Sequence, residues 1–405
     1  MNKLLLLAVL SSTTAFSSEY IVKLKTNNTK SLNSLGQVTP LNLSFGNFAI
    51  IKSDNKSIMK DALIDSNIEY IEPNYTYKAF DIPNDQDFSK QWGLHNTGKN
   101  SGSIWAPGKK GIDISALEAW AITKGDKTIK IAVIDTGVDY NHKDLVKNIM
   151  INDAELNGTA GVDDDGNGFI DDTYGYDFGE NDNDPMDGHG HGTHCAGVIG
   201  ASHNGIGIAG VMASVKILPV KFLKDNGQGS LAGAIGAIDY AISRGVNIMS
   251  NSWGGGGNSK ALKEAIERAM DKGIIFIAAA GNSNADNDTT MTIPAGYDLP
   301  NIISVGALDG KGKRAKFSNY GKKSVHVFAP GVDIYSTVQD DKYKKMSGTS
   351  MACPHVAGIA GLILANEPNL DFNEVRKRMM DTSIRSSELD DYTASGYVDA
   401  YQAIK

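Results

Sequence analysis

The chain has 405 residues, enough for two or three domains or one large domain with an accessory one. Apolar residues make up 41% of it, so a full core can be buried, and the formal net charge of −8 argues against nucleic acid or an anionic membrane as the main partner. Two cysteines, Cys195 and Cys353, are too few for a disulfide framework and leave either one bridge or two free thiols.

The N-terminus MNKLLLLAVLSSTTAFSS, residues 1–18, has the build of a secretory signal peptide. One Lys precedes an apolar run from Leu4 to Leu10, and small residues follow it. The run is too short to span a bilayer, and no other apolar run approaches membrane length. An N-terminal core segment is the alternative. We therefore expect an exported, soluble mature protein without a membrane span, either extracellular or periplasmic.

Residues 19–78 are predicted to form a small, separate α+β module. EYIVKLK, FGNFAIIKS and IEYIEPNYTY read as strands, and SIMKDALIDS has helical spacing. Residues 79–112 are rich in Pro, Gly, Asn, Ser and Asp with little periodicity. They are predicted to be a linker or an extended segment that leads into the next domain.

Residues 113–405 are predicted to form an α/β domain. ALEAWAITKG is predicted to be an amphipathic helix that ends at Gly125, and IKIAVIDTG a buried strand. The apolar runs SVKILPVKFL, VNIMSNS, GIIFIAAAGN and NIISVGAL alternate with the helical stretches LAGAIGAIDYAISRG and KALKEAIERAMDKG. This alternation indicates a parallel sheet covered on both faces. Functional residues gather at the carboxyl ends of such strands, where Asp135, Ser252 and Asn282 stand.

Three segments place a reactive side chain at the end of a predicted element. Asp135 in VIDTGVDYNHKDL follows a strand, His191 in HGTHCAGVIGA starts a helix rich in Gly and Ala, and Ser350 in MSGTSMACPHVAGIAGLILA opens a long apolar helix. Nucleophilic acyl transfer needs a base that takes the serine proton and an acid that orients the imidazolium. Asp, His and Ser are the residue types that this chemistry uses.

The stretch DGHGHGTHCAG also leaves a zinc hydrolase open. His189, His191 and His194 are spaced H-x-H-x-x-H, close to the H-x-H-x-D-H of the metallo-β-lactamase hydrolases. However, Thr193 stands where that pattern has Asp, and no second cluster of zinc ligands follows. An esterase of the α/β-hydrolase type is disfavoured because GTSMA lacks the second Gly of G-x-S-x-G.

The motifs VIDTGVD, HGTHCAG and GTSMACPHVAG resemble those of the subtilisin-like serine proteases, in the order Asp, His, Ser along the chain. The resemblance covers nearly the whole chain. It implies an α/β three-layer sandwich with a central, mostly parallel sheet over residues 113–405, with residues 79–112 leading into it. It also implies that residues 19–78 are a small α+β, ferredoxin-like inhibitory pro-domain, removed by cleavage within about residues 77–84 of an autoprocessed zymogen.

The resemblance implies a secreted serine endopeptidase with a role for each matching residue. Asp135 is implied to be the orienting acid, His191 the general base and Ser350 the nucleophile, while Asn282 and the Ser350 N–H form the oxyanion hole. A non-catalytic binding protein on this scaffold is disfavoured because the set is intact. Thr292 is expected near the base of the pocket for the residue before the scissile bond. The walls of that pocket are implied to be Ser252, Trp253, Gly254, Ala279, Ala280 and Gly281.

Two calcium sites are expected. DDDGNGFIDD alternates oxygen ligands like the first half of an EF-hand loop, but Tyr174 stands where the final Glu belongs, and a solvated acidic loop is the alternative. The ligands predicted there are Asp163, Asp165, Asn167, the Phe169 carbonyl and Asp171. The resemblance implies a second site made by Asp85, Asp144 and Asn204 with the carbonyls of Ser202, Ile206 and Ile208. A weaker cation site is not expected, because His326 stands where many members have an Asp.

The resemblance further implies polypeptide substrates with an apolar or medium-sized residue before the scissile bond, the chain's own pro-domain as an intramolecular inhibitor, structural calcium ions and a monomer. Cys195 lies four residues after His191, and Cys353 lies three after Ser350. Each thiol is therefore predicted one helical turn below a candidate catalytic residue. The two thiols are expected to lie close together and support the site, with a disulfide as the alternative.

Overall fold

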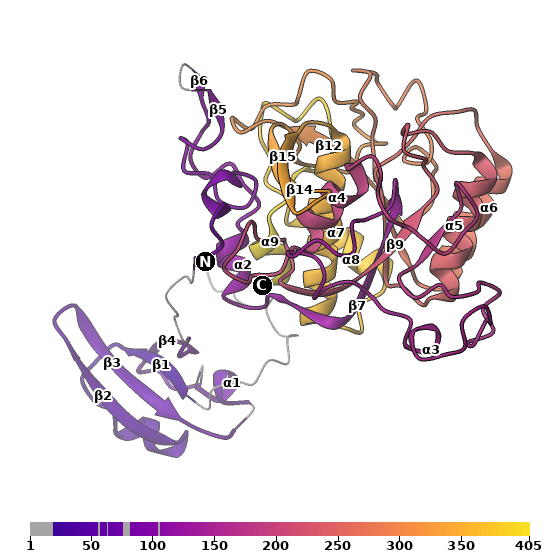
Figure 1. Cartoon of the computed structure of the whole chain (residues 1–405). Coiled ribbons are helices and arrows are strands. Elements are labelled where there is room, and N and C mark those ends of the chain that lie inside the picture. Colours follow the sequence, from indigo (N-terminus) through magenta and orange to yellow (C-terminus); the bar gives the residue numbers. More distant parts are fainter. Residues whose placement is uncertain (1–18, 56, 63, 76–81, 104–105) are drawn as a thin grey trace. The chain divides into compact units, whose positions relative to one another are not determined.

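The computed structural model describes residues 19–55, 57–62, 64–75, 82–103 and 106–405 (Figure 1). The predicted signal peptide and most of the predicted cleavage region lie outside the described residues. The chain divides into two compact units, Met1–Ala79 and Phe80–Lys405. Each unit has a hydrophobic core of its own.

The N-terminal unit is an antiparallel sheet with the strand order β2-β3-β1-β4. Alternation in β1 turns Val22 and Leu24 toward a core that also contains Leu32 and Ile58. One strand, β2, was not predicted; it contains Pro40, which an edge strand tolerates because one side of it forms no ladder. The elements are β1 (Glu19–Leu24), the 3-10 helix η1 (Lys30–Ser34), β2 (Gln37–Leu43), β3 (Gly46–Lys52), α1 (Ile58–Ala62) and β4 (Ile68–Pro73).

The C-terminal unit is built on an eight-stranded sheet with the order β16-β13-β12-β11-β10-β7-β9-β8, in which every neighbouring pair is parallel. This confirms the predicted α/β fold. Ile131 and Val133 enter one core and Ala132 and Ile134 the other, because successive side chains of a strand face opposite sides. The strands are β7 (Gly125–Asp135), β8 (Tyr176–Asp177), β9 (Ser214–Lys221), β10 (Ile248–Asn251), β11 (Ile275–Ala279), β12 (Ile302–Leu308), β13 (Val327–Pro330) and β16 (Gly396–Tyr397).

Helices cover both faces of this sheet (Figure 1). α4 (His191–Gly200) and α7 (Thr349–Asn366) pack in one core, and α5 (Leu231–Ser243) and α6 (Lys260–Asp271) pack in the other. Among the described helices, α7 alone is long and apolar enough to cross a membrane, but 89% of that stretch is buried inside the protein. It is therefore a core helix. The remaining elements are η2 (Phe88–Lys90), β5 (Gly102–Ser103), β6 (Ala106–Pro107), α2 (Ala116–Trp120), α3 (Asp153–Leu156), β14 (Ile334–Val338), β15 (Lys342–Met346), α8 (Phe372–Asp381) and α9 (Ala400–Ile404).

The helix predicted to end at Gly125 is shorter than the sequence suggested. α2 ends at Trp120, whose indole N–H donates to the Val211 carbonyl at 2.8 Å. Gly125 instead begins β7, with a φ of 97° that favours glycine. The β-branched residues Ile122 and Thr123 disfavour a longer helix. Gly125 instead pairs with β9 as a strand residue.

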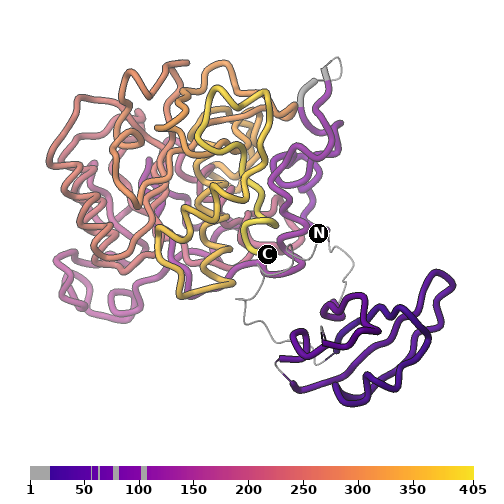
Figure 2. Tube along the Cα trace, turned by 180° about the vertical axis from the view of Figure 1, so that it is seen from behind, coloured from indigo at the N-terminus to yellow at the C-terminus, as the bar shows by residue number. Residues whose placement is uncertain are grey.

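The two ends of the C-terminal unit meet beside each other. The N–H of Ala400 in α9 donates to the Ile114 carbonyl at 2.8 Å, and the Ser115 hydroxyl donates to Asp399 at 2.8 Å. Figure 2 shows the yellow C-terminal trace next to the purple start of this unit. The unit is therefore closed by contacts between its first and last helices.

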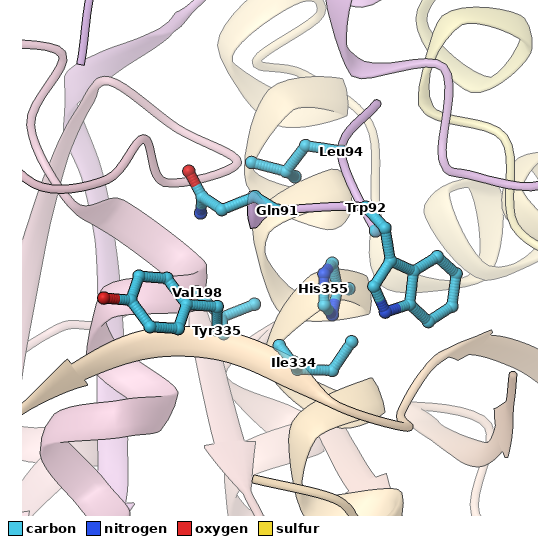
Figure 3. A pocket seen from close by; sticks show the side chains of 8 residues that line it. Gln91, Trp92, Leu94, Val198, Ile334, Tyr335 and His355 are labelled. Carbon is cyan, nitrogen blue, oxygen red and sulfur yellow. The ribbon is translucent and has the colours of Figure 1, made fainter. Parts of the chain in front are cut away.

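Residues 82–103 and 106–112, part of the segment predicted to be a linker, belong to the C-terminal unit and pack against the rest of it. Trp92 and Leu94 face His355 of α7 and Ile334 of β14 (Figure 3). The cavity among these side chains is about 10 Å³, room for one water at most. Burial lowers the pKa of His355 to about 4, and its Nδ1 lies 2.8 Å from the Met351 carbonyl oxygen, so the ring is a neutral packing group.

Candidate active site

The candidate residues gather where the order of the strands reverses. β8 and β9 lie on one side of β7, and β10 to β13 lie on the other. A crevice forms outside the carboxyl ends of parallel strands at such a switch point. Here His191, Ser350 and Asn282 line one cleft of about 850 Å³.

Asp135 is the last residue of β7 and is fully buried. Its Oδ1 lies 2.7 Å from Nδ1 of His191 and accepts the Thr136 N–H at 2.7 Å. Its Oδ2 has no hydrogen-bond partner among the described residues. A buried carboxylate held on one side by an imidazole favours the tautomer that carries its proton on Nδ1.

His191 is the first residue of α4, and its side chain is 21% exposed, so the ring reaches the cleft. Burial alone lowers the pKa of the imidazole, but the charge and hydrogen bond of Asp135 outweigh it, and Asp187 adds to the effect. The pKa of His191 therefore lies above its ordinary value. With Nδ1 bound to Asp135, Nε2 is the atom left for chemistry in the cleft.

Asp187, which the sequence analysis missed, fixes the start of α4. Its Oδ1 accepts the Thr136 hydroxyl at 2.9 Å and the N–H groups of His189 and Gly190 at 2.9 and 2.8 Å. Its Oδ2 accepts the N–H and the hydroxyl of Thr193 at 2.9 and 2.6 Å. One carboxylate thus ties the residue after Asp135 to the turn that presents His191. An Asp just before a helix was the available indication.

Ser350 lies in the first turn of α7, and its hydroxyl donates to the Ser252 carbonyl at 3.1 Å. Among the described residues it makes no hydrogen bond to His191, although both line the same cleft. Such bonds are often long in a free enzyme and tighten when substrate binds.

The carbonyl oxygen of Ser350 has an unusual set of donors. In a helix it would accept the N–H four residues on, but Pro354 stands there and has none. The Ser252 hydroxyl donates to this oxygen at 2.9 Å, and the Cys195 thiol does so at 3.4 Å. Side chains from two other segments therefore satisfy the backbone of the candidate nucleophile.

Cys195 and Cys353 are free, buried thiols, so the disulfide alternative is not realised. Burial, with the charge of Asp135, raises the pKa of Cys195, and burial raises the pKa of Cys353 to about 11. Carboxylate, imidazole and thiol atoms of Asp135, His191 and Cys195 lie within 4.8 Å of one another. Of these atoms, Asp135 Oδ1 and His191 Nδ1 are hydrogen-bonded to each other, and the thiol donates to the Ser350 carbonyl.

The other two histidines of the HGHGTH stretch have different surroundings. His189 is exposed at the cleft. Burial lowers the pKa of His194 to about 3, and its Nε2 lies 2.9 and 3.1 Å from the carbonyl oxygens of Ile334 and Lys344. His194 is thus engaged by β14 and β15, and the three rings do not converge as zinc ligands would.

Asn282 lies three residues beyond β11, and its side-chain oxygen is anchored. It accepts the N–H and the hydroxyl of Thr349, each at 2.9 Å. The same hydroxyl accepts the Gly281 N–H at 3.2 Å. Because Oδ1 is occupied in this way, the amide N–H₂ remains to donate into the cleft.

Five of the six predicted pocket walls line the cleft, namely Ser252, Trp253, Gly254, Ala279 and Gly281. Ala280 does not; it is fully buried in the core on the α7 side, the same core that Ala279 contacts. Thr292 lines the cleft as expected. Apolar lining residues that the sequence analysis missed are Phe222, Leu231, Ala234 and Leu262.

Asp85, Asp144 and Asn204 converge as the resemblance implied. The Asn204 side chain donates to Asp144 Oδ1 at 3.1 Å, and its N–H donates to Asp85 Oδ1 at 3.0 Å. Asp85 Oδ2 is buried without a partner in the described part of the chain. The Ile208 N–H donates to the Asp144 carboxylate. Ser202 is buried, and its N–H donates to the Asp144 backbone carbonyl. A buried, unpartnered carboxylate oxygen in an oxygen-rich cluster fits a calcium ion.

The acidic loop is organised differently from the prediction. Carboxylate oxygens of Glu155, Asp165 and Asp172 lie within 4.8 Å of one another, and the Arg244 guanidinium lies 2.7 Å from Asp165. Glu155, from α3, was missed. The predicted ligands Asp163 and Asp171 instead accept backbone N–H groups within the loop. Asn167 joins the cluster through its amide, and Phe169 packs beside the α5 core.

A model described as the subtilase family matches residues 126–401. A thermophilic serine proteinase of Bacillus sp. (strain AK1) is 37% identical over 88% of this chain and 78% of its own length. Thermitase of Thermoactinomyces vulgaris is 37% identical over 72% of this chain and 94% of its own. Subtilisin-like protease 1 of Plasmodium berghei (strain Anka) is 33% identical over 88% of this chain but 59% of its own.

The parallel sheet and a cleft lined by a serine and by a histidine that is bound to a buried Asp, together with these matches, define the class: the protein is a serine endopeptidase, a hydrolase of peptide bonds. Within that class, the chain belongs to the subtilase family. The resemblance drawn from the three motifs is thereby confirmed.

Proposed function

We propose that Asp135, His191 and Ser350 are the catalytic triad of this endopeptidase. His191 Nε2 takes the proton from Ser350 Oγ as the oxygen attacks the scissile carbonyl, and then gives it to the leaving amine. Asp135 holds the Nδ1–H and stabilises the imidazolium. Water then hydrolyses the acyl-enzyme by the same proton transfers in reverse. The observation that carries this proposal is the 2.7 Å contact between Asp135 and His191 at the cleft that Ser350 lines.

The oxyanion of the tetrahedral intermediate is proposed to bind between the Asn282 amide and the Ser350 N–H. The first N–H groups of a helix lack acceptors within the helix, so the Ser350 N–H at the start of α7 is available. The anchored Oδ1 of Asn282 supports a fixed direction for its N–H₂. One such donor stabilises the transition state by about 3 kcal/mol.

The substrate chain is proposed to run along Ser252, Trp253 and Gly254. A Cβ added at Gly254 would lie 2.9 Å from the Ile293 carbonyl oxygen, so this wall has no room for a side chain. The aromatic pair Phe222 and Trp253, with ring centroids 4.9 Å apart, supports peptides with apolar side chains.

Structural calcium is proposed at Asp85, Asp144 and Asn204, with the carbonyls of Ser202, Ile206 and Ile208. The ion would neutralise two buried carboxylates and so hold the loops that carry them. The acidic loop is the proposed second site, with Glu155 and Asp172 added to the predicted ligands. Arg244 already supplies one positive charge there, which favours weaker binding.

The N-terminal unit is proposed to be an inhibitory pro-domain of an exported zymogen. One face of its sheet is packed on its own core, while the other carries Phe48, Tyr70 and the 74%-exposed Phe45. An open aromatic face on so small a unit favours an interaction surface. N-terminal sequencing of purified mature protein tests this; a start at residue 19 would contradict cleavage within about residues 77–84.

The central test compares casein hydrolysis by the wild type and by Ser350→Ala. We expect activity in the processed wild type and a loss of about 10⁶-fold in the variant. A processed, folded wild type without activity would contradict the proposal.

A further inference from the structure

The side chain of Asn319 lies at the centre of a hydrogen-bonded network beside the candidate oxyanion site. Asn319 is 1% exposed and lies in the loop between β12 and β13. Its Oδ1 accepts the N–H groups of Ser283 and Ala285 at 2.9 and 3.0 Å. Its Nδ2 donates to the Ala280 carbonyl oxygen at 3.0 Å. These partners stand on both sides of Asn282.

The turn that carries Asn282 has little support of its own. β11 ends at Ala279 and no helix follows, so the turn does not belong to a regular element. Gly281 and Asn284 both have positive φ, at 108° and 54°. The chain therefore adopts a conformation here that a neighbouring segment must hold.

Only an amide matches the groups around Asn319. Two N–H donors face its oxygen, and three oxygen acceptors face its nitrogen: the Ala280 carbonyl, Asn287 Oδ1 and Thr292 Oγ1, the last two at 3.1 Å. A carboxylate at this position would place an oxygen where the NH₂ group now lies, facing the three acceptor oxygens without a hydrogen bond to them. A hydrophobic side chain would leave buried donors and acceptors unpaired.

We propose that Asn319 is a positioning residue for the oxyanion donor: its amide fixes the Ala280–Ala285 turn so that the Asn282 N–H₂ points at the developing oxyanion. Thr292, which also bonds Asn319, lines the cleft, so the same amide joins the floor of the substrate pocket to that turn. The inference rests on the proposed role of Asn282.

The test is a double-mutant cycle on the processed enzyme with a chromogenic peptide substrate. Asn319→Asp keeps the volume and the oxygen that accepts two N–H groups. We expect it to lower kcat about 10-fold to 100-fold, as a displacement of about 1 Å does, with KM within about twofold. Asn282→Ala alone is expected to lower kcat about 100-fold to 1,000-fold. Adding Asn319→Asp to Asn282→Ala is expected to cost less than about threefold more.

A buried asparagine that merely stabilises the fold would give a different pattern. The kcat effects of the two substitutions would then multiply, and that result overturns the inference while leaving the role of Asn282 in place. An unchanged kcat in Asn282→Ala would overturn the proposed oxyanion role and, with it, this inference. Asn301→Ala, which removes a buried amide that donates to the Ile274 carbonyl before β11, is the control expected to lower Tm without changing kcat.

If Asn319→Asp does not accumulate as folded enzyme, Asn287→Ala tests the same network from its far side. Asn287 accepts from the Asn319 amide and itself donates to the Ala280 carbonyl at 2.8 Å. It does not line the cleft. We expect a smaller loss of kcat, about threefold to tenfold, that again disappears in the Asn282→Ala background. A loss that persists there overturns the inference.

Discussion

Ser252→Ala removes the stronger of two donors to the carbonyl oxygen of Ser350. The hydroxyl donates at 2.9 Å, whereas the Cys195 thiol, a weak donor, lies at 3.4 Å. A buried oxygen that loses its partner costs about 1–3 kcal/mol, because the helix cannot supply another donor at Pro354. We expect the free energy of unfolding to fall by about 2 kcal/mol and Tm by about 4 °C.

Pro354→Ala supplies the missing helical N–H and so removes the need for the Ser252 hydroxyl. In that background the carbonyl oxygen accepts a helical hydrogen bond, and Ser252→Ala is expected to cost less than about 1 kcal/mol. Thermal unfolding is measured on full-length Ser350→Ala protein, which keeps the carbonyl of residue 350 and cannot digest itself. Ser259→Ala, which removes the α6 N-cap, is expected to cost about 1 kcal/mol in both backgrounds. An equal cost of Ser252→Ala in the two backgrounds would show that the Ser252 hydroxyl does not stabilise the protein through this oxygen.

Three further predictions concern titration and calcium. The raised pKa of His191 places the acid limb of the kcat/KM profile above about pH 6.5. Asp135→Asn removes the carboxylate that raises this pKa, so the limb is expected to move to lower pH while kcat falls as much as about 10⁴-fold. An acid limb that stays at the same pH in Asp135→Asn would contradict the role of Asp135 in raising the pKa. The pKa of about 4 for buried His355 lies below that of an unfolded histidine, so the unfolded chain binds one more proton between about pH 6.5 and 4. The stability that His355 contributes is present above this pH window and is lost as the pH falls through it, by about 1.4 kcal/mol per pH unit. In His355→Gln, denaturant unfolding is expected to give a smaller slope of the free energy of unfolding against pH. Calcium chelation is expected to lower Tm in the wild type but to have little further effect in Asp144→Asn, whereas Asp163→Asn keeps most of the response.

The sequence predicted the parts of the site that lie in local motifs. Asp135, His191 and Ser350 each stand at the end of an element whose own pattern reveals it, and the parallel sheet follows from unbroken apolar strands. Asn319 was missed because it contacts a turn more than thirty residues earlier, which no local period reports. Glu155 was missed because it lies in α3, before the loop whose N–H groups it accepts. Ala280 was assigned to the pocket wall together with its neighbours, but its side chain is fully buried in the core.

The helix ending at Gly125 was predicted too long for a related reason. The apolar spacing of a helix continues past Trp120. However, Gly125 pairs with β9, and this pairing with a distant strand cannot be read from the local sequence. Likewise, the acidic loop reads as an ion site by its alternating oxygens. The structure instead directs several of those oxygens to backbone N–H groups and brings in Glu155 and Arg244 from other elements.

The contact between Ala400 and Ile114 has a consequence for how the enzyme reaches its native state. The last helix closes against the first across almost the whole C-terminal unit, and the sheet places its first long strand in the middle with later strands on both sides. The chain must lose loop-closure entropy before such non-local contacts stabilise it, so the folding barrier is high. The carbonyl of Ser350, to which side chains of two other segments donate, is aligned only after that barrier is crossed. The N-terminal unit is synthesised first, and all its strand pairings lie within residues 19–73, so it is expected to fold sooner; refolding rates with and without it test whether it assists the rest of the chain.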